Sequence, residues 1–443
     1  MTGREANPTS LRGVCILPDD VLLTIFLEFR EPIDVRSGEN WLCATTISHV
    51  CREWRGLIIN TPTFWTKIRL IPSPSRMQRA KAYIKRSKDC PLNVYVACDK
   101  SFDNLNEEDG VDFMILIQDC VSRWRTVCFE AGAHRWMEFL IAIMPQRVEW
   151  VHNIESLELI QRDYSPTTHE KYPRLHTLLK ESAPLALKNL RIRRVPFPWT
   201  TLQGIKNLTC LDIRHLATEL PYLTFRDVLL TSQGLQQLLI REVALIIEDD
   251  ADYPTTILPS LQSLEISPFD EFCTARLCSL LSTPKLQSLF VSNIGELCSF
   301  TEECLQTSLP KYPAVTSLKI SDVSLGDRIP EEFYTSFPML KHFTLLEWSG
   351  WYDDIFGRLN TNGFDPPTCP DVQPQQLPLA WPQLESITLN IPLWPPENNS
   401  LTRAIASRFA ATGSEIKYSE EGVEEDSDSS DEEYRNESEH DDT

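Results

Sequence analysis

A short apolar unit recurs through most of the chain. It has the form apolar-x-x-apolar-x-apolar, and the alternation of its last two apolar positions predicts a short strand with one buried face. Successive units between Leu187 and Leu340 begin 21, 27, 26, 25, 29 and 25 residues apart. Repeats of this length that each supply one strand predict a curved, parallel sheet with helices or irregular returns on its outer side. The units are Trp124/Val127/Phe129, Ile154/Leu157/Leu159, Leu187/Leu190/Ile192, Leu208/Leu211/Ile213, Leu235/Leu238/Ile240, Leu261/Leu264/Ile266, Leu286/Leu289/Val291, Val315/Leu318/Ile320, Leu340/Phe343/Leu345 and Leu384/Ile387/Leu389.

Proline precedes the first apolar position by two residues in five of these units. Proline at that position ends a preceding helix and opens an extended segment, which fits the predicted return from helix to strand. The five residues are Pro259, Pro284, Pro313, Pro338 and Pro382.

The repeat pattern resembles that of leucine-rich repeats, although one feature of that family is mostly missing. The position after each strand that usually holds Asn or Cys is held by residues such as His215, Glu242, Asn293 and Asp322, of which only Asn293 suits an asparagine ladder. We therefore expect irregular turns and a degenerate solenoid. The alternative is a compact α/β domain whose strands happen to share a pattern.

The repeat is interrupted between Leu340 and Leu384, a gap of 44 residues. Insertions in a repeat array map to loops on one face, often the binding face, and Trp and Tyr dominate interface hot spots. Trp348, Trp351 and Tyr352 are therefore our candidate substrate-binding residues. The alternative is that the aromatic residues cap the open end of the array.

The N-terminal region has the spacing of short amphipathic helices. Pro18 suits a first helical position, and Asp19 and Asp20 place negative charge at the start of the helix. Helical spacing then runs through Val21, Leu22, Ile25, Phe26 and Phe29, and again through Ile47, Val50, Cys51, Trp54, Leu57 and Ile58. About fifty residues of small helices enclose little core. We expect part of this apolar surface to be covered by a partner.

The same region resembles an F-box, through the segments Leu17 to Phe26, Ile47 to Trp54 and Thr61 to Trp65. The resemblance implies that the helices bind a Skp-type adaptor and, through it, a cullin–RING ubiquitin ligase. The polar link Glu31 to Trp41 is longer than is usual in the family. The candidate adaptor contacts that the resemblance implies are Leu17, Pro18, Leu22, Ile25, Phe26, Val50, Cys51 and Trp54.

The acidic charge of the chain is concentrated at its C-terminal end. The formal net charge is −21, and residues 415–443 hold 14 acidic and two basic residues. Such a segment cannot bury enough apolar surface to offset its ordering entropy, so we expect a disordered tail. Ser429 and Ser430 lie three residues before acidic ones and are weak candidates for phosphorylation. The simpler interpretation is a solubilising tail.

The overall expectation is an α/β protein that begins with a small helical F-box, continues as an irregular leucine-rich-repeat solenoid with a curved parallel sheet, and ends in a disordered acidic tail. The expected segments are 1–13 (flexible), 14–70 (F-box), 71–123 (linking helix and first strand), 124–412 (repeats) and 413–443 (tail).

The basic segment Arg76 to Lys88 is predicted to form a helix with a solvated face. It has no interleaved aromatic residues that would indicate nucleic-acid binding.

Composition adds constraints on compartment and chemistry. No apolar run approaches 18 residues and the N-terminus lacks a signal-like apolar stretch, so we expect a cytoplasmic or nuclear protein without a membrane segment. The 13 cysteines form no Cys-x-x-Cys pair. For the closest pairs, Cys273 with Cys278 and Cys298 with Cys304, buried free thiols are the better interpretation, and we expect no bound metal.

No motif in the chain predicts catalysis or a cofactor. Phosphate-binding loops, dinucleotide fingerprints, nucleophile elbows and His-Glu-x-x-His are all missing from the sequence. We therefore expect a subunit that recruits an unidentified protein substrate to a ubiquitin ligase, and not an enzyme. The alternative is a repeat scaffold whose F-box-like unit joins no ligase. A hydrolase with an unrecognised site would need a polar pocket that the sequence does not indicate.

Overall fold

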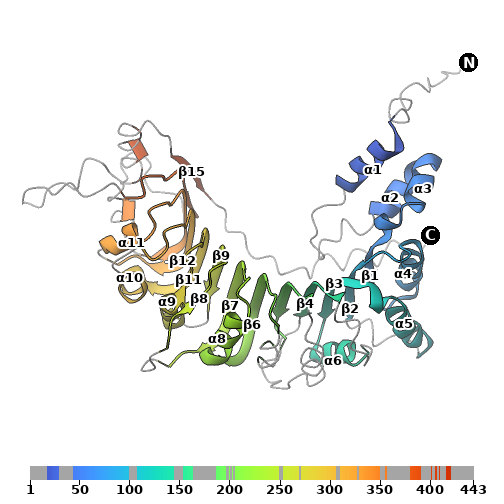
Figure 1. The fold of residues 1–443 in the computed structure, drawn as a ribbon, viewed down its shortest axis with the longest axis horizontal. Helices are drawn as coiled ribbons and strands as arrows, with labels where there is room; N and C mark the ends of the chain where they lie inside the picture. The colour runs from blue at the N-terminus through green and yellow to red at the C-terminus, as the bar shows by residue number, and fades with distance from the viewer. Residues whose placement is uncertain are drawn as a thin grey trace, which may run out of the picture. The chain divides into compact units, whose positions relative to one another are not determined.

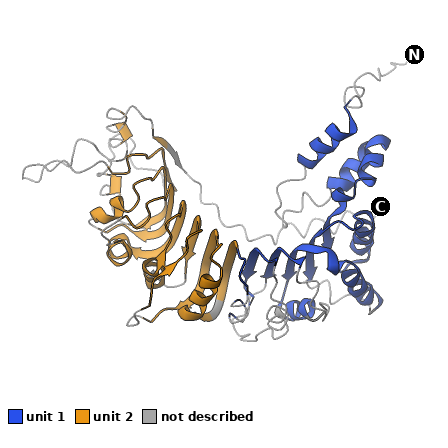
Figure 2. Cartoon of the chain, viewed as in Figure 1, with its two compact units in different colours: residues 1–208 blue, residues 209–443 orange. Residues whose placement is uncertain are grey.

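The computed structural model divides into two compact units, residues 1–208 and 209–443 (Figure 2). Each unit is mixed α/β and contains a parallel sheet. The structure describes residues 17–28, 43–98, 107–143, 153–162, 186–195, 205–248, 253–268, 271–305, 310–326, 329–349, 380–390 and 416–420, with the short pieces 199, 202, 355–356, 401, 405–406 and 409.

The first unit begins with short helices and continues as a sheet whose strands follow chain order, β1-β2-β3-β4-β5. Helices α4, α5 and α6 lie along one side of it (Figure 1). The elements are α1 (Asp19–Glu28), α2 (Cys43–Val50), α3 (Arg52–Ile59), η4 (Pro62–Trp65), β1 (Lys67–Leu70), α4 (Pro74–Arg86), β2 (Leu92–Cys98), α5 (Glu107–Cys120), η6 (Val121–Arg123), β3 (Trp124–Ala131), α6 (His134–Ile143), β4 (Ser156–Gln161) and β5 (Asn189–Arg193).

The sheet of the first unit starts earlier than the sequence pattern predicts. Strand β1 lies inside residues 14–70, which we expected to hold only the F-box, and α5 was not predicted. Strand β1 has only four residues, with Ile68 and Leu70 buried on one side, and so short an alternation gives too little periodicity to recognise.

In the second unit, each strand is followed by a connecting segment that leads to the next parallel strand. The strand order is β6-β7-β9-β11-β12-β13-β14-β15. Helices α8 to α11 lie along one side of it (Figure 1). The elements are β6 (Cys210–Pro221), α8 (Tyr222–Thr231), β7 (Gln237–Ile246), β8 (Thr256–Ile257), β9 (Ser263–Ser267), α9 (Glu271–Leu280), β10 (Leu281–Ser282), β11 (Ser288–Glu296), α10 (Leu297–Cys304), β12 (Ser317–Ser324), α11 (Glu331–Thr335), β13 (His342–Ser349), β14 (Ser386–Leu389) and β15 (Lys417–Glu420).

The apolar unit of the sequence forms the core of both sheets. All three anchors of all ten units are buried, and each unit contributes one strand. The second anchor of one unit is in register with that of the next: Val127, Leu157 and Leu190 align in the first unit. Leu211, Leu238, Leu264, Leu289, Leu318, Phe343 and Ile387 align in the second. The predicted strands and their parallel arrangement are confirmed.

The backbone just beyond the third anchor is regular, whereas we expected irregular turns there. Two residues after the third anchor, the backbone enters the left-handed region in six units, at Arg194, His215, Glu242, Asn293, Asp322 and Glu347, with φ between 48° and 56°. In five of these units the next residue is apolar and buried, namely Val195, Leu216, Val243, Ile294 and Val323. The left-handed position is held by residues of different types, so a motif that requires asparagine there does not reveal it. What the units share is the backbone conformation and the buried apolar residue that follows.

Valine at one of these left-handed positions should destabilise the second unit. We expect Glu242→Val to lower its free energy of unfolding by about 1–2 kcal/mol, because a β-branched side chain is strained at positive φ. Gln237→Val, at an exposed position of the same strand, is the matched control and should change it by less than about 0.5 kcal/mol. Urea unfolding followed by circular dichroism measures both. Equal effects of the two substitutions would contradict the strain argument.

One predicted boundary also changes in the second unit. Strand β15 pairs with β14, and Ile416 before it is buried, so ordered structure continues past the boundary expected at residue 413. Residues 421–443 lie outside the described residues. In the interruption between Leu340 and Leu384, Ile355, Phe356 and Trp381 are buried in the unit.

Candidate functional site

The N-terminal helices form where local chemistry favours them. The N–H of Leu22 donates to the carbonyl of Pro18 at 3.0 Å, and α1 carries Asp19 and Asp20 in its first turn. Helix α3 is capped by Cys51, whose Sγ accepts a hydrogen bond from the Trp54 N–H at 3.4 Å. Cys51 therefore stabilises the start of α3.

Aromatic packing joins α1 to α3. The rings of Phe26 and Trp54 meet edge to face with centroids 4.6 Å apart. Phe26 and Leu22 are buried, whereas Trp54 is half-buried. Of the candidate adaptor contacts, these three and Cys51 therefore lie in or beside the interior of the helical region.

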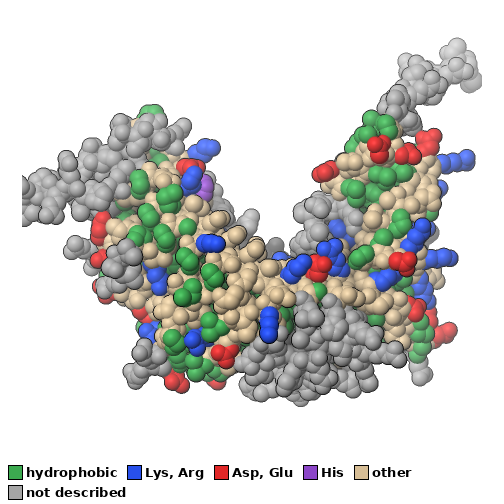
Figure 3. Space-filling view, in the orientation of Figure 1, with side chains coloured by type: hydrophobic (Ala, Val, Ile, Leu, Met, Phe, Trp, Pro, Cys, Tyr) green, Lys and Arg blue, Asp and Glu red, His purple; other side chains and the backbone are tan. Residues whose placement is uncertain are grey.

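The other candidates are exposed, and they share the helices with further exposed apolar residues. Val21 and Ile25 lie four residues apart on one side of α1, and Leu17 lies two residues before the helix begins. Val50 at the end of α2 is 59% exposed, and Pro18 is exposed as well. Figure 3 shows hydrophobic side chains on the surface of these helices. We define the helical apolar surface as Leu17, Val21, Ile25, Leu27, Val50 and Ile59, each at least 37% exposed. Of these, the sequence indicates Leu17, Ile25 and Val50 as candidate adaptor contacts and Val21 only as an apolar helix position, whereas it does not single out Leu27 and Ile59.

A cluster around Trp65 joins α2 and α3 to α4. The fully buried Trp65 donates from Nε1 to the carbonyl of Ile58 at 2.9 Å, and its ring meets Tyr83 edge to face at 4.8 Å. Arg86 lies 4.3 Å from the centre of the Trp65 ring. The hydroxyls of Thr45 and Tyr83 are 2.7 Å apart, which links α2 to α4, and burial raises the pKa of Tyr83 so that it stays neutral.

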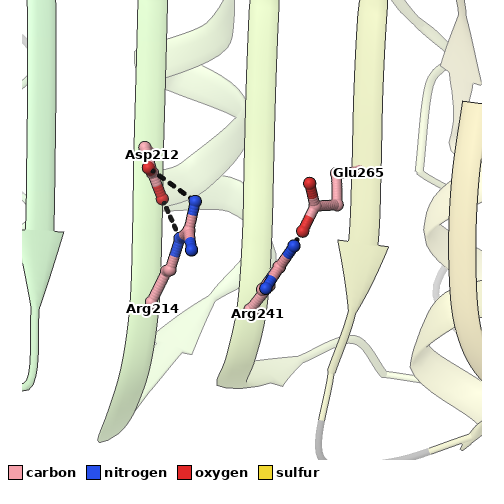
Figure 4. A network of polar contacts seen from close by, with 4 residues as sticks. All are labelled: Asp212, Arg214, Arg241 and Glu265. Atoms are coloured by element: carbon pink, nitrogen blue, oxygen red, sulfur yellow. Dashed lines mark hydrogen bonds and ion pairs between the residues drawn. The ribbon is translucent and has the colours of Figure 1, made fainter. Parts of the chain in front are cut away.

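The face of each sheet that lies opposite the described helices carries polar networks that the sequence pattern did not reveal. In the second unit, Arg214 donates to both oxygens of the buried Asp212, at 2.7 Å from Nε and 3.0 Å from the terminal nitrogen (Figure 4). On the next strands Arg241 pairs with Glu265 (Figure 4). Each arginine of this network is thus matched by one carboxylate.

Phe290 extends this network along the same face. Its ring lies 5.9 Å from the Arg241 guanidinium and 5.4 Å from the Lys319 ammonium. Attraction between cations and the ring face holds these long side chains in place.

The corresponding face of the first unit is centred on the buried Glu130. Its carboxylate accepts hydrogen bonds from the Tyr95 hydroxyl and from Arg162. Arg69 lies over the Tyr95 ring at 5.3 Å, and Arg194 donates to the carbonyl of Arg162 at 3.0 Å. Figure 3 shows Lys and Arg side chains gathered over the strands of this unit.

The remaining candidates are only partly described. Trp348 is half-buried at the end of β13, in register with Val323. Trp351, Tyr352, Ser429 and Ser430 lie outside the described residues. Of the three aromatic candidates, only Trp348 lies within the described residues.

The described cysteines are free thiols, and of the two close pairs Cys278 and Cys304 are buried whereas Cys273 and Cys298 are half-buried. Burial raises the pKa of Cys120 to about 11 and that of Cys278 to about 12, so both are protonated near neutral pH. Within the described ranges, no three His, Cys, Asp or Glu side chains form a group that could hold a metal ion.

Comparison with known proteins does not identify the chain. Among the described helices, none combines the length and apolar character needed to cross a membrane. No protein-family model matches the sequence, and no curated protein matches it either.

Proposed function

We propose that the chain is the substrate-recognition subunit of a Skp–cullin–F-box type ubiquitin ligase. Helices α1 to α3 would bind a Skp-type adaptor, and the strand repeats, which we propose to be a leucine-rich-repeat solenoid, would hold a protein substrate. The chain itself would carry out no chemistry. It would accelerate ubiquitin transfer by holding the substrate close to the loaded enzyme.

The observation that carries this proposal is the helical apolar surface. Three short helices leave Val21, Ile25, Leu27, Val50 and Ile59 exposed, and exposed apolar surface is what a protein partner would cover. Leu22 and Phe26 hold the helices together, so Leu17, Ile25 and Val50 stay available for a partner. Spaced apolar anchors on a short helix are typical of recognition in a groove.

Support for the repeat proposal comes from the register. Each unit supplies one strand and aligns its second anchor with that of its neighbour, and six units share the left-handed turn residue. Each unit buries its apolar anchors against its neighbours, which is how repeat arrays are stabilised. The open faces of such strands offer side chains to a partner.

A bridging experiment tests the proposed role. A cullin fixed to a solid support should retain the full-length chain only when a Skp-type adaptor is also present. Retention without the adaptor, or no retention with it, would contradict the role. A repeat scaffold that joins no ligase remains the second candidate, and it predicts no retention in either case.

A further inference from the structure

The second unit leaves three large apolar side chains exposed where strand β7 ends and helices α8 and α9 begin. Phe272 in the first turn of α9 is 69% exposed, the highest value among the large apolar side chains that the structure describes. Leu223 in the first turn of α8 and Ile246 at the end of β7 are 52% and 40% exposed. We define the strand-end patch as Leu223, Ile246 and Phe272.

Backbone contacts bring the three elements of the strand-end patch together. Strand pairing places Ile246 beside Pro221, which directly precedes α8. The Cys273 thiol of α9 donates to the carbonyl of Leu245 at 3.1 Å, which joins the start of α9 to the end of β7. Cys273 and Leu245 are the direct neighbours of Phe272 and Ile246 in the chain. The exposed side chains therefore come from adjoining elements.

Buried neighbours hold the start of α8 in place. Tyr222, directly before Leu223, is buried, and its hydroxyl lies 3.2 Å from the Thr256 hydroxyl. The Tyr222 ring also meets the Tyr253 ring edge to face, with centroids 4.8 Å apart. Apolar side chains on a fixed backbone lose little conformational freedom when a partner covers them, which favours binding.

Acidic residues accompany the strand-end patch. Glu219 near the end of β6 and Glu248 just after β7 are exposed. The sequence from Glu242 to Ala275, which contains Ile246 and Phe272, has eight acidic residues and no lysine or arginine.

The basic residues around this stretch do not balance its charge. Two of the eight carboxylates pair with His215 and Arg241. Helices α8 and α9 contribute one basic residue each, Arg226 and Arg276. Even one further pair with each arginine leaves an excess of carboxylates, and the whole chain has a net charge of −21.

We propose that the strand-end patch is a docking surface for a basic segment of a protein partner, in which an aromatic or aliphatic side chain is flanked by lysine or arginine. The apolar side chain covers Phe272 and its neighbours, and the flanking cations meet the carboxylates. The acidic charge of the whole chain attracts the same partner over a longer range.

Charge argues against the other molecules that could cover an apolar patch. A second copy of this chain would bring the same acidic residues against each other. A nucleic acid or an anionic membrane would bring phosphates. Each of these adds negative charge to a surface that already has an excess of it.

This inference deepens the proposed function, and it rests on it only in identifying the basic segment as part of the substrate. The helical apolar surface and the strand-end patch share no residue. A peptide-binding experiment that contains no adaptor can therefore fail while adaptor binding succeeds, and the reverse also holds.

The experiment measures fluorescence anisotropy of a labelled peptide, Lys-Lys-Trp-Leu-Lys-Lys, titrated with the full-length chain. We expect binding that weakens as salt is added, since exposed charges are screened. Phe272→Ser should weaken it at least about fivefold, because it removes an apolar contact at the centre of the patch. Leu223→Ser is a second variant with the same expected direction. Circular dichroism and urea unfolding check that the variants fold.

Two matched controls keep the chemical change and move its position within the same unit. Phe409 is 54% exposed, and Phe409→Ser should bind the peptide like the unmodified chain. Glu248→Lys should weaken binding more than Glu332→Lys, because Glu332 is an exposed residue of α11 and the change in net charge is identical.

Several results would overturn the proposal. The first is absence of binding to the unmodified chain, and the second is an equal loss in Phe272→Ser and Phe409→Ser. A peptide with serine in place of its Trp and Leu should bind more weakly, and equal binding would assign the interaction to charge alone. Self-association of the chain that Phe272→Ser abolishes, measured by analytical ultracentrifugation, would assign the patch to a second copy.

Discussion

Replacing Ile25 and Val50 together by aspartate is expected to abolish binding of a Skp-type adaptor. Both side chains belong to the helical apolar surface and are 37% and 59% exposed, so the substitutions leave the interior of the helices untouched. Burying two carboxylates in an apolar interface is costly, and hot-spot residues each contribute 2 kcal/mol or more. We expect an affinity loss of at least about a hundredfold, measured by isothermal titration calorimetry with the full-length chain.

The first unit offers a matched control for this double variant. Val111 and Ile115 on α5 are also exposed, at 53% and 49%, and lie four residues apart on one helix face. Val111→Asp with Ile115→Asp adds the same charge and removes similar apolar surface in the same unit. Adaptor affinity should then stay within about threefold of the unmodified chain, since differences below 0.5 kcal/mol are usual for surface changes. If both double variants lost binding equally, the docking surface would lie elsewhere.

Replacing Trp65 by alanine is expected to cause the largest loss of stability. The side chain is fully buried, contacts Tyr83 and Arg86, and donates a hydrogen bond to the Ile58 carbonyl. Removing a buried tryptophan costs about 3–5 kcal/mol through lost contacts and the cavity that remains. We expect that decrease in the free energy of unfolding of the first unit, from urea titration followed by circular dichroism.

Trp65→Phe separates ring packing from the hydrogen bond. It keeps most of the aromatic volume and loses the donor, so its cost should stay near 1–3 kcal/mol. A loss below about 1 kcal/mol for Trp65→Ala would contradict the view that this cluster attaches α2 and α3 to α4.

The strands could be predicted because their signal is local and repeated. The three anchors of each unit keep the same spacing within the unit, and all thirty are buried. The parallel pairing could be predicted because each repeat supplies one strand. Strand β1 and helix α5 were missed for different reasons. The first is too short to show periodicity, and the second carries exposed apolar residues such as Val111 and Ile115 that blur its amphipathic pattern.

The candidate site could be predicted only in part. Spacing on α1 identifies Leu22 and Ile25 as apolar helix positions, but it cannot tell which faces inward, because that depends on where Trp54 lies. The network around Glu130 was missed entirely. Tyr95 lies on β2, Glu130 on β3 and Arg162 directly after β4, and only the pairing of these strands brings them together.

Co-purification of the full-length chain with a Skp-type adaptor tests the central claim most directly. The two proteins are expressed together and passed over a size-exclusion column, with circular dichroism to show that the chain is folded. The account predicts that they elute together as a one-to-one complex. Separate elution of a folded chain and the adaptor would contradict it.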